Sequence, residues 1–167
     1  MFSFYKKHNN QLYNNLVKLS RDKFFYQEAL LEDKIENRVL LIFFHFALIL
    51  HSSKGRNKEK ETQNIFDNIF QNIEYTLREL GDGDVAVNKK MKNLSRVFYD
   101  ILVAFEKNNT TILGKNCYLL KKYFLSEEKK VTANIDKLSD YFSKFKNFCF
   151  DLDAKNMLNG SFNFIYK

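Results

Sequence analysis

The side chains that could do chemistry in this sequence are few, and their spacing argues against catalysis. His45 and His51 are six residues apart, so they cannot share a helical face as zinc ligands four residues apart do. Cys117 has no histidine near it in the sequence to lower its pKa. The serines stand in polar stretches without the sharp turn that exposes a nucleophile. We therefore expect no catalytic residue, no metal site and no enzyme activity.

The acidic loop Gly-Asp-Gly-Asp near the middle of the chain is the next candidate for binding chemistry. It lacks the Lys-Ser/Thr pair of a phosphate-binding loop, and no strand is expected before it. The spacing of Asp82 and Asp84 is similar to that of a calcium loop. Such a loop needs further oxygen ligands and a closing glutamate, whereas here Lys89 and Lys90 follow. The loop is not expected to bind a metal.

The same loop is better interpreted as a tight corner between two helices. Gly81 follows a helical pattern, at the place where a glycine in the left-handed conformation ends a helix. Asp84 stands where the side chain of an N-cap residue would accept hydrogen bonds from the next helix. The sequence therefore predicts a capped helix–turn–helix corner.

Positive charge gathers on the helix that follows this corner. Lys89, Lys92 and Arg96 are spaced at i, i+3 and i+7, so they align on one side, and Lys90 flanks them. No acidic residue lies between residues 85 and 99 to neutralise them. Such a row is either a solvated face or a docking patch for an anionic partner, and both interpretations stay open.

The elements that must hold these residues are expected to be long helices. The chain has 167 residues, about one domain, with no proline and only five glycines. Without these residues to punctuate it, the chain cannot form a many-turned sandwich or barrel. We predict a single-domain, all-α bundle of six or seven helices over residues 1–167. The net charge of +7 suits nucleic acid, ribosomes or anionic membranes.

The helix expected at about residues 35–51 is apolar nearly all round, which places it at the centre of the bundle. Its apolar run, residues 39–50, is shorter than the 20 or so residues that cross a membrane. His45 is expected to be a core histidine with its hydrogen bonds satisfied. Arg38 shares one side of this helix with His45 and, if buried, must be paired.

Either Glu79 or Asp84 is the expected partner of Arg38. This pairing would anchor the corner after Gly81 to the central helix, because both acids lie at or beside that corner.

Apolar spacing predicts further helices, and alternating aromatic residues near the end predict a short extended segment. That segment, residues 162–166, is expected to lie across the bundle or to meet a partner. Cys117 and Cys149 fall within apolar patterns and are expected to be buried free thiols. The predicted helices cover residues 8–19, 21–31, 62–80, 85–107, 110–124 and 129–150.

The corner also carries a family resemblance. The run Arg78-Glu79-Leu80-Gly81-x-Gly83-Asp84 resembles the ubiquinol–cytochrome c chaperone family, whose members are assembly factors for respiratory complex III. The likeness covers residues 12–110 or so and is much weaker beyond. Asp82 departs from the family pattern, which has an apolar residue there, so this loop is more acidic. Other matching positions are Val87, Lys89 to Lys92, Phe98 and Tyr99 downstream, and Arg21, Phe25, Tyr26, Asp33, Arg38 and His45 upstream.

The resemblance implies a non-enzymatic chaperone that holds newly made cytochrome b, or its ribosome, until haem insertion and complex assembly. The implied partners are cytochrome b or another complex III subunit, with the ribosome and the inner membrane surface as further contacts. No small-molecule substrate and no bound haem or other cofactor is expected. The residues expected to meet a partner are Lys89, Lys90, Lys92, Arg96, Arg78 and Asp82, and those expected to be structural are Arg38, His45, Glu79, Gly81, Gly83 and Asp84.

Two other functions fit the same features. One is a basic helical module that binds nucleic acid or the ribosome without a membrane-protein client, and the other is a purely structural or oligomerising bundle. The first ten residues have neither the apolar run of a secretory signal nor the Arg/Ser-rich character of a transit peptide. We therefore expect a bacterial cytoplasmic protein, in peripheral contact with the inner membrane, rather than one of the mitochondrial matrix.

Overall fold

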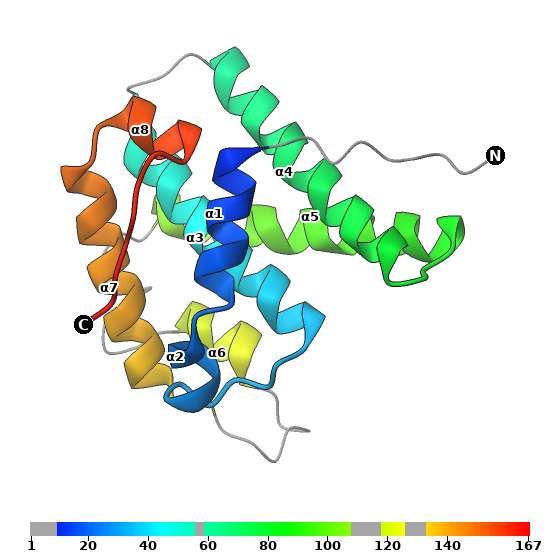
Figure 1. The fold of residues 1–167 in the computed structure, drawn as a ribbon, viewed down its shortest axis with the longest axis horizontal. Helices are drawn as coiled ribbons and strands as arrows, with labels where there is room; N and C mark the ends of the chain where they lie inside the picture. The colour runs from blue at the N-terminus through cyan, green and yellow to red at the C-terminus, as the bar shows by residue number, and fades with distance from the viewer. Residues whose placement is uncertain (1–9, 56–58, 108–117, 126–132) are drawn as a thin grey trace.

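The regular structure of this chain is helical throughout the part that the computed structural model describes, which is residues 10–55, 59–107, 118–125 and 133–167. The predicted all-α fold is confirmed, with six helices of seven residues or more and two shorter ones in that part (Figure 1). The helices are α1 (Gln11–Ser20), α2 (Lys23–Gln27), α3 (Ile35–Ser53), α4 (Glu59–Glu79), α5 (Asp84–Lys107), α6 (Tyr118–Phe124), α7 (Ile135–Asp151) and α8 (Ala154–Asn159).

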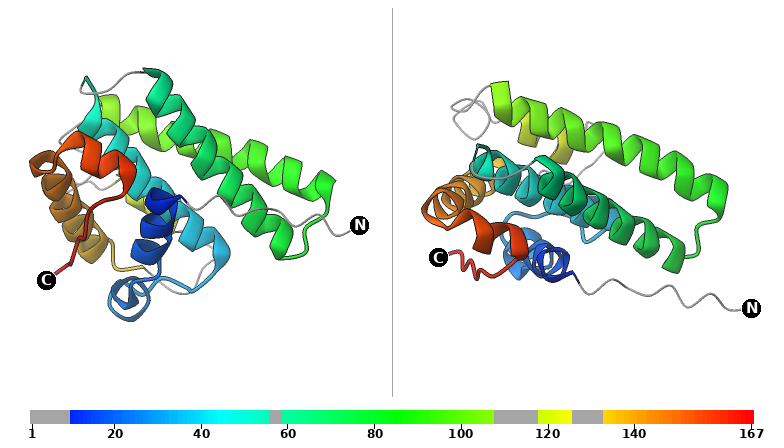
Figure 2. Two further views of the ribbon diagram at one scale, coloured as in Figure 1. Left: turned by 45° about the horizontal axis from the view of Figure 1, so that its top comes forward. Right: turned by 90° about the horizontal axis from the view of Figure 1, so that it is seen from above.

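The central helix is α3, as its apolar sequence predicts. Helices α1, α5, α7 and α8 all pack directly on it, and residues 41–50 are all buried. Seen from above, α5 lies on one side of α3 and α1 on the other (Figure 2). Among the described residues, α3 is the one helix long and apolar enough to cross a membrane. The neighbouring helices cover residues 41–50, so this part of α3 lies in the core of the bundle.

The N-terminal helices differ from the prediction at one end. Asn10 caps α1 by accepting a hydrogen bond from the backbone N–H of Tyr13 at 2.9 Å, and Asp22 caps α2 through Phe24. The helix expected over residues 21–31 is only five residues long. It stops early because Leu30 adopts a positive φ of 59°, which a continuing right-handed helix does not allow.

Helices α4 and α5 form a hairpin whose corner extends beyond the other helices, while its second half packs in the core of the bundle (Figures 1 and 2). The side of α5 that faces inward is the one predicted from its periodicity. Val87, Phe98, Ile101 and Phe105 are buried there, and Met91 packs on them half-buried. The hairpin therefore offers its opposite side to solvent.

The last helices are α6, which packs on α7, then α7 itself and the short α8. Asn134 caps α7, which therefore begins at residue 135. Helix α8 was not predicted; it ends at Gly160, which takes a left-handed φ of 78°. Cys149 is buried, as expected, and burial raises the pKa of its thiol.

Several predictions fall on parts of the chain that the structure does not describe. These are the environment of Cys117, the start of the helix expected at residue 110, and the chain before residue 10. They stay predictions.

Residues 161–167, which we call the tail, run extended across the surface of α7 (Figure 1). Phe162, Phe164 and Tyr166 face the bundle half-buried, while Ile165 faces outward and is 66% exposed. The first of the two predicted arrangements, a segment lying across the bundle, is confirmed.

Candidate functional site

The corner between α4 and α5 begins with Gly81, and this residue ends α4 as the sequence predicts. Gly81 has a φ of +97°, the left-handed conformation that ends α4. Its N–H donates to the carbonyl of Arg78 at 3.0 Å, and the N–H of Asp82 donates to the carbonyl of Leu77 at 3.3 Å. This pair of bonds is the Schellman motif, which satisfies the last carbonyls of a helix. Gly81 is therefore a structural residue, as predicted.

The predicted role of Asp84 as N-cap is wrong. The N–H of Val87 donates to the carbonyl of Gly83 at 2.9 Å, so Gly83 occupies the N-cap position and Asp84 is the first residue of α5. The carboxylate of Asp84 instead accepts a hydrogen bond from Arg78. Arg78 also donates two bonds to Glu74, one turn earlier on α4. Arg78 thus joins the ends of the two helices, and its expected contact with a partner stays a prediction.

The predicted anchoring of this corner by Arg38 is also wrong. The guanidinium of Arg38 donates two hydrogen bonds, of 2.7 and 2.9 Å, to the carboxylate of Asp33 just before α3. These bonds hold the pKa of the Asp33 carboxyl below its usual value. Arg38 is half-buried rather than buried, so its pairing need not reach across the molecule. Glu79 and Arg38 do line one cleft, of about 520 Å³, between α1, α3 and α4.

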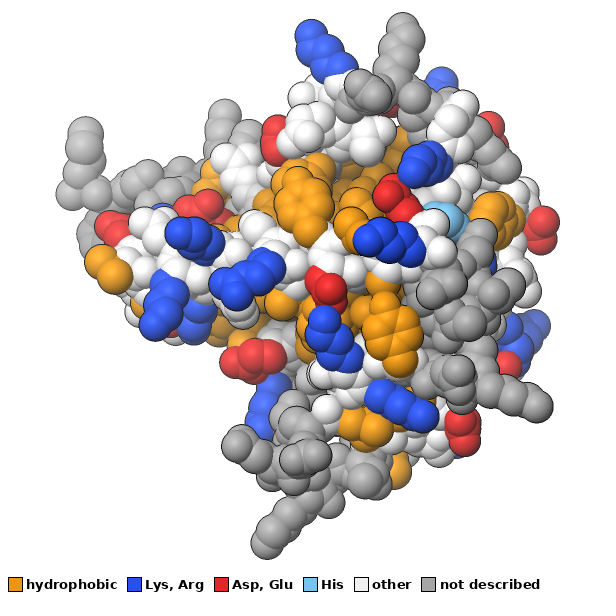
Figure 3. All heavy atoms as spheres, turned by 180° about the vertical axis from the view of Figure 1, so that it is seen from behind, with side chains coloured by type: hydrophobic (Ala, Val, Ile, Leu, Met, Phe, Trp, Pro, Cys, Tyr) orange, Lys and Arg blue, Asp and Glu red, His pale blue; other side chains and the backbone are white. Residues whose placement is uncertain are grey.

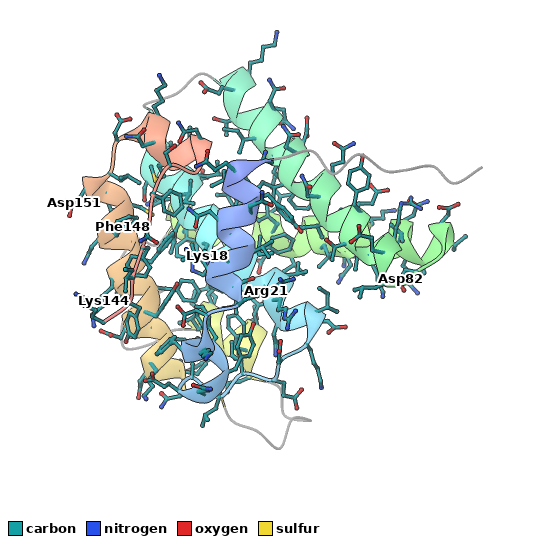
Figure 4. All side chains as sticks on the ribbon, in the orientation of Figure 1. Lys18, Arg21, Asp82, Lys144, Phe148 and Asp151 are labelled. Carbon is teal, nitrogen blue, oxygen red and sulfur yellow. The ribbon has the colours of Figure 1, made fainter. Side chains whose placement is uncertain are left out.

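Two of the residues expected to meet a partner bind each other. Lys90 donates to the carboxylate of Asp82 at 2.7 Å, which closes the corner from the side of α5 (Figure 4 labels Asp82). The acids of the corner, Asp82 and Asp84, are each therefore neutralised by a cation of the chain itself. Lys90 is thus paired within the chain, and the expected contact of Lys90 and Asp82 with a partner stays a prediction.

The other three cations keep their charge available. Lys89, Lys92 and Arg96 are all exposed, and none of them is in an ion pair within the described part of the chain. Their role in binding a partner stays a prediction. The structure adds that apolar side chains extend the same row in both directions.

We call this row the α5 stripe. Val85 precedes the three cations and is 84% exposed, while Tyr99 and Val103 follow them and are 50% and 40% exposed. The six positions are separated by four, three, four, three and four residues, which keeps them on one side of the helix, as in a coiled-coil seam. Viewed from behind, Lys and Arg side chains gather toward the left of the molecule, with hydrophobic side chains exposed toward its middle (Figure 3). The stripe is Val85, Lys89, Lys92, Arg96, Tyr99 and Val103.

A cleft adjoins the apolar end of the stripe. It has a volume of about 540 Å³ and lies between the end of α3, the start of α4 and the second half of α5. Tyr99 belongs to both the stripe and this cleft, whose wall includes Phe66 and Leu102. Lys54 and Glu106 form an ion pair of 3.0 Å at its rim. The stripe and the cleft together present cations, then aromatic and aliphatic surface, along one helix.

His45 is a core histidine, as predicted, and takes no part in a surface site. It is fully buried on α3, with Nδ1 2.6 Å from the carbonyl oxygen of Leu41 and Nε2 2.9 Å from the hydroxyl of Tyr141. Because a carbonyl only accepts, Nδ1 carries the proton and Nε2 accepts from Tyr141. Burial lowers the pKa of His45 to about 4, so the ring is neutral near pH 7.

Tyr141 is the residue in this cluster that the sequence did not reveal. It stands 96 positions from His45 on α7, within a row of aromatic residues whose spacing predicts only a buried face. Within the described residues, no group of histidine, cysteine and acidic side chains is arranged to hold a metal ion.

Comparison with known proteins relates most of the chain to one family. The family model described as ubiquinol–cytochrome C chaperone matches residues 27–164. The match thus extends well past residue 110, where the resemblance read from the sequence ended, and takes in α6, α7, α8 and part of the tail. A comparison with curated protein sequences gives no match.

One solved structure matches over nearly the whole chain. It is the crystal structure of the Cbp3 homolog from Brucella abortus, with 25% identity and a TM-score of 0.72. The alignment covers 93% of this chain and 87% of that one. The bundle described above is therefore an arrangement that this relative shares.

Proposed function

Since this chain belongs to the ubiquinol–cytochrome c chaperone family, we propose that it is a non-enzymatic assembly factor that holds newly made cytochrome b, or the ribosome making it. The observation that carries the proposal is the α5 stripe. Lys89, Lys92 and Arg96 retain their charge there because the acids of the corner are paired elsewhere. The cations attract an anionic partner, and the apolar positions next to them give a hydrophobic client a surface to contact.

The exposed cations and apolar side chains of the stripe do not stabilise the folded chain, which favours a role in binding. Exposed cations aligned at helical spacing repel one another by a few tenths of a kcal/mol per pair. Exposed apolar side chains likewise gain nothing from folding while they remain in water. Both features become favourable when a partner binds, because an anionic group then neutralises the cations and an apolar surface covers the apolar side chains.

The experiment is capture of the client by the whole chain after brief crosslinking in membranes that contain complex III subunits. The test variant replaces Lys89, Lys92 and Arg96 with Glu. Cytochrome b should be recovered with the wild-type chain and lost, at least tenfold by our estimate, with the variant, because three favourable charge contacts become repulsive.

A matched control carries the same change of net charge at another surface. Lys18, Lys23 and Lys155 are exposed on α1, α2 and α8, away from the α5 stripe. Replacing these three with Glu should leave recovery of cytochrome b near the wild-type level. Equal loss in both triple variants would mean that overall charge, and not the stripe, governs the contact, and the proposal would fail.

The aligned cations also support a second candidate, a nucleic-acid- or ribosome-binding module without a membrane-protein client. Contacts from three cations to phosphates would make binding of duplex fall with salt with a log–log slope of about −2.7. Such a slope, lost in the variant with three glutamates and unaccompanied by cytochrome b, would favour this alternative.

The proposed location is the cytoplasm, with peripheral contact at the inner face of the inner membrane. An exposed lysine or arginine gains about 1 kcal/mol near an anionic leaflet. Flotation with vesicles containing anionic lipid should therefore carry the wild-type chain more than the variant with three glutamates. Equal flotation of the two proteins would count against the contact.

A further inference from the structure

The tail lies in a groove lined by aromatic side chains from two helices. Phe24 and Tyr141 are buried at one end, Phe145 is buried in the middle, and Phe148 is half-buried at the other. We call these four side chains, from α2 and α7, the aromatic groove. Figure 4 labels Phe148 and Lys144 on α7, beside the path of the tail.

Every second side chain of the tail enters this groove. The ring of Phe164 lies 5.2 Å from the rings of both Phe145 and Phe148, measured between centroids. The ring of Tyr166 lies 4.5 Å from Phe24, at the other end. The side chains between them point to solvent. The groove thus accepts an extended chain with an aromatic residue at every second position.

The backbone of the tail is held in the way a bound peptide is held. Asn15 on α1 donates its side-chain amide to the carbonyls of Gly160 and Phe162, at 3.2 and 2.8 Å. Lys144 on α7 donates to the carbonyl of Lys167 at 3.0 Å. Within the described part of the chain, no backbone–backbone hydrogen bond joins residues 162–167 to the bundle. The backbone of the tail is therefore held by polar side chains of α1 and α7, and not by pairing in a sheet or helix.

The floor of the groove is also held by contacts with the core that do not involve the tail. Tyr141 is fixed from below by its hydroxyl, which donates to Nε2 of His45 in the core. Phe145 also packs against the ring of His45, at 4.7 Å between centroids. Ordering the tail costs backbone and side-chain entropy, which its three half-buried rings must offset. A segment in trans with the same rings could make the same contacts, but it must compete with the effective concentration of the tethered tail.

We infer that the aromatic groove is a binding site for an extended polypeptide segment with aromatic side chains at every second position, occupied here in cis by the tail. The natural occupant rests on the proposed function, since it would be a segment of the hydrophobic client. The tail then shields the groove until such a segment displaces it.

The test is binding of a labelled peptide with the sequence of residues 160–167 to the full-length chain. In the inward variant, Phe162→Ser and Phe164→Ser remove the rings that seat the tail. In the outward control, Asn163→Ser and Ile165→Ser change side chains that face solvent. A tail in cis has an effective concentration in the millimolar range, so the inward variant should bind the peptide at least ~10-fold more tightly than the wild type or the outward control.

The peptide itself carries the reciprocal control, because serine at the positions of its two phenylalanines should abolish binding. The inference is overturned if the inward variant melts cooperatively and yet fails to bind the unmodified peptide, or if all three proteins bind it alike. Should the inward variant lose its cooperative melt, Tyr166→Ser frees only the end of the tail and is judged by the same criterion.

Peptide binding needs no membrane extract, so it separates the groove from the client. Peptide binding without capture of cytochrome b would leave the groove standing and remove the proposed client. Capture of cytochrome b without peptide binding would support the proposed client and rule out the groove as its binding site.

Discussion

The α5 stripe and the aromatic groove are two surfaces of the same bundle, and they differ in what covers them. The stripe presents cations and apolar side chains to solvent along the outer side of α5, whose inner side packs on the core. The groove lies directly above the buried His45–Tyr141 pair, and the chain covers it with its own tail. Water stabilises an exposed cation, whereas aromatic surface is stabilised when another segment buries it.

This difference means that the stripe and the groove should respond in opposite ways to substitution. Changes on the stripe should alter binding and leave stability nearly unchanged, because few native contacts are lost there. Changes in and around the groove should alter stability first, because its floor is the core.

The contrast is tested most directly by truncating one side chain on each surface. Phe145→Ala should lower the free energy of unfolding by about 3–5 kcal/mol, because it empties a fully buried site. Val103→Ala on the stripe should change it by less than about 0.5 kcal/mol. Urea unfolding of the two variants measures both values. Similar losses would mean that the stripe is part of the core, and the distinction drawn here would collapse.

Acid should act on the groove side and not on the stripe. The unfolded chain binds a proton at His45 below about pH 6.5, but the folded chain does so only near pH 4, since burial lowers the pKa of His45. Stability is therefore complete above pH 6.5 and should fall by about 3 kcal/mol as the pH drops to 4.

Urea unfolding at several pH values measures this loss. His45→Leu should remove the dependence in that window, whereas His51→Gln should keep it. The carboxyl of Asp33, whose pKa is lowered by hydrogen bonds from Arg38, loses its contribution only at still lower pH. A wild-type chain with constant stability from pH 6.5 to 4 would contradict the buried, neutral histidine.

Two glycines with positive φ sharpen the comparison, because one stands beside each surface. A Cβ at Gly160, before the tail, would come within 2.6 Å of the backbone nitrogen of Leu12, whereas a Cβ at Gly81 would meet nothing within 4 Å. Gly160→Ala should therefore cost about 2–5 kcal/mol, from backbone strain and overpacking together, and Gly81→Ala only about 1–2 kcal/mol. Thermal unfolding of the two variants measures which loses more stability. A larger loss for Gly81→Ala would contradict the close approach of α1 to Gly160.

The smallest effect on stability is expected at the pair formed by Asp82 and Lys90. Asp82→Asn should change the free energy of unfolding by less than about 1 kcal/mol, because the pair lies near the surface. It should nevertheless release Lys90 as a fourth cation beside the stripe and strengthen binding of vesicles with anionic lipid. Lys90→Gln, which also breaks the pair, is the matched control and should not strengthen that binding. A gain in both variants would point to the corner itself rather than to charge.

The sequence predicts the helices well where the pattern depends on local periodicity. The centre at α3, the inward side of α5 and the glycine at residue 81 all follow from apolar spacing and backbone preference. The early end of α2 does not, because Leu30 takes a conformation that its own type disfavours. Helix α8 is too short for its periodicity to stand out.

The contacts of the site are less predictable than its elements, and for two different reasons. Asp33 lies five residues before Arg38, at the entry to α3, so short-range reach could have identified this pair in place of Asp84. The partner of His45 could not be found in this way, since Tyr141 is one of many aromatic residues on a helix whose rotation the sequence leaves open. The alignment of Lys89, Lys92 and Arg96 on one exposed side follows from their spacing alone, whereas the pairing of Lys90 with Asp82 depends on the geometry of the corner.

The hydrogen bond between His45 and Tyr141 also places a condition on biosynthesis. The imidazole sits in the first third of the chain, while the hydroxyl that completes its bonding is made 96 residues later. While the chain is still on its ribosome and Tyr141 has not been made, Nε2 of His45 has no hydroxyl to donate to it. Until then the hydrogen bond that Nε2 accepts must come from water. Completion of this chaperone must therefore wait for its own final helices, and translation arrested before residue 141 should release a product that proteases readily degrade.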